Sequence, residues 1–174
     1  MFRKFTVKML TLQAMLAALS IILTRFCQIP INESLRISFG NIPVLLSGLL
    51  GGPLAGALVG AVADIIGCIF FNPFGWYPPL TLSPFIYGII AGLFARAFIS
   101  RQSYVKCLIA ALVCNACSTM TVSTVILANM QGLPSPLPLL ALRIPLYIGI
   151  TVCEALALYL IYKSKILRKA GISK

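Results

Sequence analysis

The chain is dominated by long apolar runs, which glycine, proline and charged residues interrupt. A transmembrane α-helix needs about 20 consecutive residues that are mainly apolar. The runs predict six spans, at residues 9–28, 39–51, 53–71, 80–99, 105–129 and 138–162. The second run is short for a span and the fifth is long, so five or seven spans stay open as alternatives. We expect an all-α membrane protein, folded as one compact bundle over residues 1–174.

Glycines recur at every fourth position through the third predicted span, from Gly52 to Gly60, and Asp64 continues the series. Residues four apart share one face of a helix. Small residues at this spacing let a second helix approach closely inside a membrane. Gly88 and Gly92 repeat the spacing in the fourth span. The pattern therefore predicts tight packing between helices in this part of the chain.

The composition excludes a soluble globule. Of 174 residues, 60% are hydrophobic and 10% are charged, with a mean hydropathy of +1.01. Soluble domains carry about 25% charged residues, because their surface faces water. A disordered chain is excluded by the same numbers, since disordered segments are poor in apolar residues.

The basic residues gather on one predicted side of the membrane. The chain has a net charge of +11, and eleven of its 14 basic residues precede the first span, lie between or at the facing ends of the fourth and fifth, or follow the sixth. Cytoplasmic loops of membrane proteins carry an excess of lysine and arginine. The protein is therefore predicted to lie in the plasma membrane with both termini in the cytoplasm. Two termini on the same side require an even number of spans. This placement explains the charge without a nucleic-acid partner.

Several kinds of catalysis find no support in the residues. The chain has no histidine, which is the usual general base and a common metal ligand. It has no GxxxxGK[ST] phosphate loop, so ATP hydrolysis by this chain is not expected. Cys114 and Cys117 form a CxxC motif inside an apolar span, where cysteine commonly acts as a small hydrophobe. We expect no catalytic residue, no bound metal and no cofactor. Asn115, between the two cysteines of this motif, is expected to hydrogen-bond across helices or to a ligand.

Three charged residues lie well inside predicted spans, away from the span ends: Asp64, Arg143 and Glu154. A charge inside the membrane is costly and usually marks an ion pair or a ligand contact. Either Asp–Arg or Glu–Arg pairs hold the helices together, or these residues form a polar ligand site in the outer half of the bundle. Arg25 and Arg36 lie near span ends, where they can reach the interface or the same ligand site.

The connection between the third and fourth spans is uncharged and rich in aromatic residues and proline (residues 72–79, NPFGWYPP). Trp76 and Tyr77 would suit the aromatic belt found at membrane interfaces. The density of turn-forming residues also fits a shaped loop that covers a planar ligand. Both interpretations stay open.

Several segments resemble one family. Residues 34–43 (SLRISFGNIP), 51–56 (GGPLAG) and 64–67 (DIIG) resemble the substrate-binding S components of energy-coupling factor (ECF) vitamin transporters. Residues 74–82 (FGWYPPLTL) and the Arg25-Phe26 pair look like the folate-specific branch. The resemblance extends over the whole chain in size and in its six-span layout.

The resemblance implies a two-part transporter. An S component binds a vitamin from outside and then docks on a transmembrane coupling subunit, which two cytoplasmic ATPases drive with ATP. The S component topples in the membrane to release its substrate inward. Family members dock through an Ala-x-x-x-Ala face on the first helix, and Ala14 and Ala18 match it here. Packing within the chain is the alternative role of these alanines.

A folate ligand gives the candidate residues distinct roles. Aromatic side chains would stack on the planar pterin. A carboxylate could accept from its amino-pyrimidine edge, and arginines could bind the carboxylates of the glutamate tail. The predicted substrate-binding residues are Arg25, Arg36, Asp64, Phe74, Trp76, Tyr77, Asn115 and Arg143.

Three alternatives remain. The first is an S component for riboflavin, thiamine, biotin, pantothenate or a queuosine precursor, with the same fold and partners. The second is a structural or scaffolding membrane protein without a small-molecule ligand. The third, a lipid-modifying enzyme, finds no paired carboxylates and no activated nucleophile in the sequence.

Overall fold

A computed structural model describes residues 7–32, 35–71, 78–98, 104–130, 132 and 137–163. The helices are α1 (Val7–Arg25), α2 (Asn41–Gly51), α3 (Pro53–Phe71), α4 (Leu82–Phe98), α5 (Tyr104–Cys114), α6 (Thr124–Met130) and α7 (Leu137–Lys163). A 3-10 turn η1 (Pro78–Thr81) precedes α4, and a π-helix η2 (Asn115–Ser123) joins α5 to α6. The strands are β1 (Ile29–Asn32) and β2 (Leu35–Ile37).

The helices match the predicted spans in position. Four described stretches are long and apolar enough to cross a membrane: Val7–Arg25, Pro53–Phe71, Cys107–Met130 and Arg143–Ile161. The apolar helices Asn41–Gly51 and Pro78–Phe94 are shorter. The described part of the chain is thus helical as predicted, with one short hairpin added.

The hairpin between α1 and α2 was not predicted. Its strands pair antiparallel, with Ile29 opposite Ile37 and an irregularity between Pro30 and Asn32. Proline at position 30 is incompatible with continuing α1, and alternating isoleucines suit a strand. Each strand is too short to give a clear strand pattern, so the sequence indicates only a connection between two helices here.

Helices α2, α3 and α4 cross at glycines, as the spacing predicts. A Cβ atom on Gly56 would lie 2.5 Å from the carbonyl oxygen of Gly88 and 2.8 Å from the Cα atom of Gly48. A Cβ atom on Gly88 would overlap the backbone of Gly56 in turn, and one on Gly60 would overlap the carbonyl of Pro84. The helices meet backbone to backbone, as small residues allow in membranes.

The fifth predicted span forms one continuous helix whose middle is wider than an α-helix. Hydrogen bonds in a π-helix join residues five apart. The Thr121 hydroxyl follows the same spacing and donates to the Ala116 carbonyl oxygen at 2.9 Å. Asn115 is the first residue of this wide segment, and its side chain is buried.

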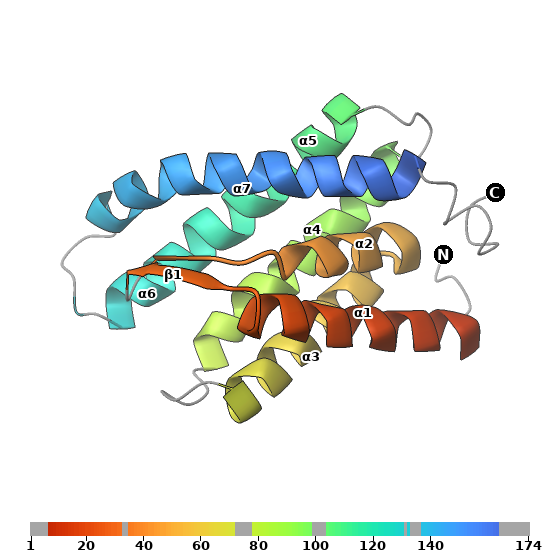
Figure 1. The fold of residues 1–174 in the computed structure, drawn as a ribbon, viewed down its shortest axis with the longest axis horizontal. Coiled ribbons are helices and arrows are strands. Elements are labelled where there is room, and N and C mark those ends of the chain that lie inside the picture. Colours follow the sequence, from red (N-terminus) through yellow and green to blue (C-terminus); the bar gives the residue numbers. More distant parts are fainter. Residues whose placement is uncertain are drawn as a thin grey trace.

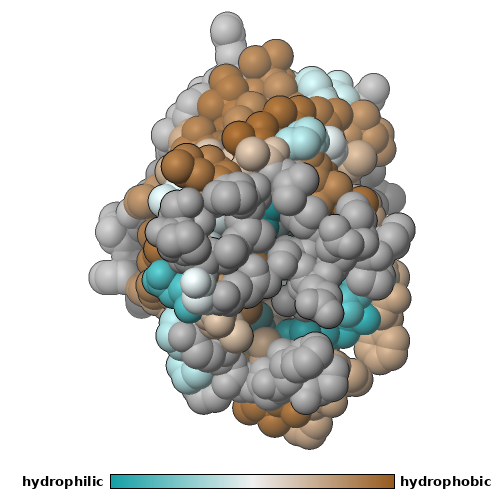
Figure 2. Space-filling model, turned by 90° about the vertical axis from the view of Figure 1, so that its left-hand side faces the viewer, coloured by the Kyte–Doolittle hydropathy of each residue, from teal (hydrophilic) through white to brown (hydrophobic). Residues whose placement is uncertain are grey.

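The two ends of the bundle differ. The start of α1 and the end of α7 lie at the same end of the molecule, on the right in Figure 1, and the hairpin lies toward the other end. The outer faces carry exposed apolar side chains, including Phe70 (74% exposed) and Met15 (71%). Figure 2 views the hairpin end: hydrophobic residues follow its outer edges, and hydrophilic ones lie nearer the middle. A broad apolar exterior is what contact with lipid requires.

Candidate functional site

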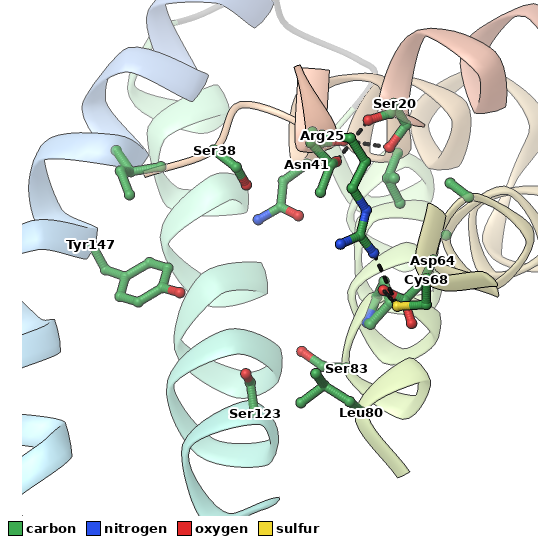
Figure 3. A pocket seen from close by; sticks show the side chains of 17 residues that line it. Ser20, Arg25, Ser38, Asn41, Asp64, Cys68, Leu80, Ser83, Ser123 and Tyr147 are labelled. Carbon is green, nitrogen blue, oxygen red and sulfur yellow. Dashed lines mark hydrogen bonds between the residues drawn. The ribbon is translucent and has the colours of Figure 1, made fainter. Parts of the chain in front are cut away.

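A cavity of about 170 Å³ lies in the half of the molecule that carries the hairpin. It lies between the α1–α4 side of the bundle and the side formed by η2 and α7 (Figure 3). Polar residues make up much of its wall: Ser20, Thr24, Arg25, Ser38, Asn41, Asp64, Ser83, Ser123 and Tyr147.

The end of α1 is fixed against the start of α2. The Ser20 hydroxyl donates to the Gly40 carbonyl oxygen at 2.8 Å, and the Thr24 hydroxyl donates to the Ser20 carbonyl oxygen at 2.6 Å. A Cβ atom on Gly40 would overlap the Thr24 side chain. Glycine at position 40 therefore lets the chain leaving the hairpin pass directly over the end of α1, which brings Ser38 and Asn41 to the cavity.

Arg25 reaches the cavity from the last residue of α1 by crossing α3 at Gly67. A Cβ atom at position 67 would lie 2.8 Å from Arg25 Nε, so the guanidinium fits only because Gly67 has no side chain. Arg25 Nη2 contacts Cys68 Sγ at 2.9 Å (Figure 3). Nε is buried and has no hydrogen-bond partner within the described part of the chain.

Asp64 lies one helical turn before Cys68 on α3. Its Oδ2 accepts from the Thr81 hydroxyl at 2.8 Å, and its Oδ1 lies 3.7 Å from Cys68 Sγ. A cation and a carboxylate thus meet the same thiol on one wall of the cavity. Such a wall offers charged donors and charged acceptors side by side, which are the strong hydrogen-bonding groups of proteins.

The opposite wall is uncharged. Ser123 of η2 and Tyr147 of α7 line it, and Figure 3 shows the Tyr147 hydroxyl turned toward the interior. Between the walls, Ser83 and Ser118 hydrogen-bond to each other, with their oxygens 3.1 Å apart, and so join α4 to η2.

Behind this site, a buried acid joins α4, η2 and α7. Glu154 has no exposed surface, and its Oε2 accepts from Asn115 Nδ2 at 2.6 Å and from the Tyr87 hydroxyl at 3.2 Å. Asn115 also receives a contact from Asn41 of the cavity wall, where Asn41 Nδ2 donates to Asn115 Oδ1 at 3.5 Å. The partners of Glu154 are therefore uncharged polar groups rather than an arginine.

A sequence profile of the family described as "ECF transporter, substrate-specific component" matches residues 8–162. The chain belongs to this family. It is a family of transporter components and not of enzymes.

Named relatives agree with that membership. This component is 35% identical over 127 residues to "Folate transporter FolT" of Clostridium novyi (strain NT), a match that covers 72% of each chain. Its structure superimposes on a solved structure described as "Crystal structure of FolT bound with folic acid". The TM-score is 0.76 and the identity 26%, over 89% of this chain and 91% of that one. The S component for biotin from an ECF-type ABC transporter matches in fold, with a TM-score of 0.70 and 19% identity over 90% and 92% of the two chains.

The structure brings together only some of the substrate-binding residues predicted for this component. Arg25 and Asp64 line the same wall. Asn115 lies one side chain behind the cavity, in contact with Asn41. Arg143 is buried at 6% exposure, donates from Nη1 to the Thr124 hydroxyl at 3.0 Å and does not line the cavity.

The remaining predicted residues lie away from the cavity or outside the described residues. Phe74, Trp76 and Tyr77 lie outside the described residues. The backbone of Arg36 belongs to β2, but its side chain is not described. Ala14 and Ala18, predicted to dock on a partner, are exposed on α1.

The sequence analysis missed most of the uncharged lining residues, such as Ser38, Asn41, Cys68 and Tyr147. Cys68 had a usable signal, because it lies four residues after Asp64 and therefore shares its helix face. Within the CxxC motif, Cys114 is buried, Cys117 is exposed, and both are free thiols. Among the described residues, no three His, Cys, Asp or Glu side chains gather as metal ligands.

Proposed function

We propose that this component binds folate or a reduced folate in the cavity from outside the cell and releases it inward after docking on an energising module. The observation that carries the proposal is the 35% identity to a folate transporter over 72% of both chains. The charged wall of the cavity supports it, because Arg25 and Asp64 supply the groups that a pterin ring requires.

The pterin edge carries two adjacent donors, the 2-amino group and the ring N–H, followed by a carbonyl oxygen. Asp64 accepts from these donors, and Arg25 donates to the carbonyl oxygen. Both side chains contact the Cys68 thiol, so they can recognise the same edge of the ligand. Of the two arginines predicted for the carboxylates of the glutamate tail, Arg36 remains the proposed partner, because Arg143 does not line the cavity. Phe74, Trp76 and Tyr77 remain the proposed stacking residues of the covering loop.

A thermal-shift screen of the detergent-purified chain tests the substrate. Folic acid and 5-formyl-tetrahydrofolate are compared with riboflavin, thiamine, biotin, pantothenate and a queuosine precursor. A ligand whose free concentration is one hundred times its dissociation constant stabilises the folded state by about 2.7 kcal/mol. We expect folates alone to raise the melting temperature. A rise in melting temperature with another vitamin would overturn folate as the proposed substrate. No change with any ligand would favour a scaffolding protein.

The variant Asp64→Ala tests the site itself. Loss of a charged acceptor for two ligand donors weakens folate binding by roughly ten- to a hundredfold. Asp64→Asn keeps an acceptor for Thr81 and serves as the matched variant of intermediate affinity. Equal dissociation constants for the wild type and Asp64→Ala, measured by titration calorimetry, would remove Asp64 from the site.

We also propose that the exposed face of α1 at Ala14 and Ala18 docks on the transmembrane coupling subunit, while two partner ATPases use ATP. Around these alanines α1 exposes Met15 and Leu19, at 71% and 45%, so a smooth apolar surface is available to another helix. The positive-inside rule supports a cytoplasmic position for both termini, with six spans crossing the plasma membrane. The start of α1 and the end of α7 lie at the same end of the bundle, which supports this placement.

A further inference from the structure

Glu154 is a fully buried acid that does not line the cavity. Acids inside membrane helices are costly and rare, so they need a reason to be there. Glu154 Oε2 accepts two hydrogen bonds, whereas Oε1 is buried and has no partner within the described residues. A proton on Oε1 would leave Oε2 an acceptor, so Oε2 accepts in either protonation state.

This acceptor sets the orientation of the Asn115 amide. Asn115 Nδ2 donates to Glu154 Oε2 at 2.6 Å and to Thr151 Oγ1 at 3.1 Å. Thr151 gives its own hydroxyl proton to the Tyr147 carbonyl oxygen at 2.7 Å, so toward Asn115 it accepts. Both acceptors belong to α7. The Asn115 nitrogen must therefore point at α7, and its Oδ1 must point away.

The orientation of Asn115 in turn sets that of Asn41. Asn41 Nδ2 donates to Asn115 Oδ1 at 3.5 Å, the longest link in the chain. The reversed Asn41 amide would place two oxygens against each other, which is repulsive. Figure 3 accordingly shows the Asn41 oxygen turned toward the Arg25 side of the cavity. In the part of the chain that the structure describes, this oxygen has no protein partner.

We propose that Glu154 is a positioning residue: directly and through Asn115 it holds the Asn41 amide nitrogen, which turns the Asn41 carbonyl oxygen toward the cavity, so that the site selects a ligand group that donates a hydrogen bond. The inference rests on the proposed function in taking the cavity as the ligand site. A site built around a fixed acceptor discriminates strongly, because a ligand without the matching donor leaves that acceptor unpaired. Donors of this kind are the N–H and amino groups of nitrogen heterocycles.

The test compares two ligands that differ in this respect. Tetrahydrofolate carries an N–H group at position 5, away from the ring edge that Asp64 and Arg25 are proposed to bind, whereas 5-deazatetrahydrofolate carries a CH₂ group of similar size there. We expect the wild type to prefer tetrahydrofolate. In Glu154→Met the Asn41 amide is free to turn, so the ratio of the two dissociation constants falls by roughly tenfold. Glu154→Gln keeps a carbonyl acceptor and restores the wild-type ratio.

A second background isolates the pathway. In Asn41→Asp the side chain offers only oxygens to the cavity, so adding Glu154→Met no longer changes the ratio. If Glu154→Met does not fold, Asn115→Leu interrupts the part of the chain that runs through Asn115 and is expected to lower the ratio in the same direction. An unchanged ratio in a folded Glu154→Met or Asn115→Leu protein overturns the inference.

A measurement without ligand keeps the inference separate from the folate proposal. The chain has five asparagines, so the side-chain amide of Asn41 can be assigned in nitrogen-labelled protein by its loss in Asn41→Asp. Its hydrogens should exchange slowly with water in the wild type and Glu154→Gln, and faster in Glu154→Met. Equal exchange in all three proteins overturns the role of Glu154. Absence of folate binding to the wild type would instead overturn the proposed substrate, and the exchange rates would still decide this inference.

Discussion

The route of one side chain shows how a cavity can depend on a residue that never touches a ligand. Arg25 enters by crossing Gly67, where a Cβ atom would lie 2.8 Å from its Nε. The atoms that such a Cβ atom would overlap belong to the flexible Arg25 side chain and not to backbone. A larger residue at position 67 can thus be accommodated by moving Arg25, which leaves the helices in place.

We therefore expect Gly67→Ala to fold and to bind folate roughly tenfold more weakly, because the guanidinium loses its contact with Cys68. Gly149→Ala is the matched control, since a Cβ atom at position 149 of α7 meets nothing within 4 Å. Calorimetric titration gives the affinity, and a melting curve confirms folding. Wild-type affinity in Gly67→Ala would show that the position of Arg25 is not needed.

Charge made part of this site predictable. Arg25 and Asp64 stood out in the sequence because charges at or within apolar spans are expensive and therefore informative. Ser38, Asn41 and Tyr147 carried no such signal, since uncharged polar residues are common in membrane helices and many of them only hydrogen-bond within the protein. Their convergence depends on how the hairpin and α7 pack, which no local pattern encodes. Arg143 had the same signal as Asp64, yet it packs against Thr124 outside the cavity lining.

At the scale of elements, the crossing of α3 and α4 is the most constrained contact. Gly56 and Gly88 bring two backbones together with no space for a methyl group. Helix backbones move only as whole units, so a side chain here must separate α3 from α4.

Gly88→Ala is accordingly expected to lower the melting temperature sharply or to prevent folding, unlike Gly67→Ala. The control is again Gly149→Ala, which should be neutral or slightly stabilising because alanine favours a helix over glycine. Thermal unfolding in one detergent measures all of these variants. A Gly88→Ala protein as stable as Gly149→Ala would mean that α3 and α4 can separate at little cost.

The sequence predicted this crossing because a four-residue glycine spacing maps directly onto one helix face. It did not predict η2, since nothing in the composition of residues 115–123 distinguishes a π-helix from an α-helix with several hydroxyl side chains. It also did not predict the hairpin, whose strands of four and three residues are too short for an alternating pattern to be decisive.

At the scale of the whole molecule, the proposed ligand site and the proposed docking face are separate surfaces. The cavity lies between helices in the half that carries the hairpin, whereas Ala14 and Ala18 are exposed on the outside of α1. Changes to the outer face of α1 should therefore leave the cavity intact.

Ala14→Leu and Ala18→Leu should keep the wild-type affinity for folate and reduce folate uptake severalfold in cells that contain the energising module. The larger side chains would hold the coupling subunit away from α1. Ala141→Leu is the matched control, because Ala141 is exposed on α7. Binding is measured on purified protein and uptake with labelled folate. Normal uptake in both α1 variants would overturn the docking face.

The wide turn of η2 bears on which changes in chain length the molecule can absorb. Deleting one residue from an α-helix rotates everything beyond it by about 100° around the helix axis. A π-helix already contains an extra residue, so a deletion between Ala116 and Val122 can be taken up by tightening to an ordinary α-helix. Asn115 would still face α7, and Thr124 would still meet Arg143. Deleting one residue of α7 between Arg143 and Glu154 would instead turn these two side chains toward different sides of the bundle.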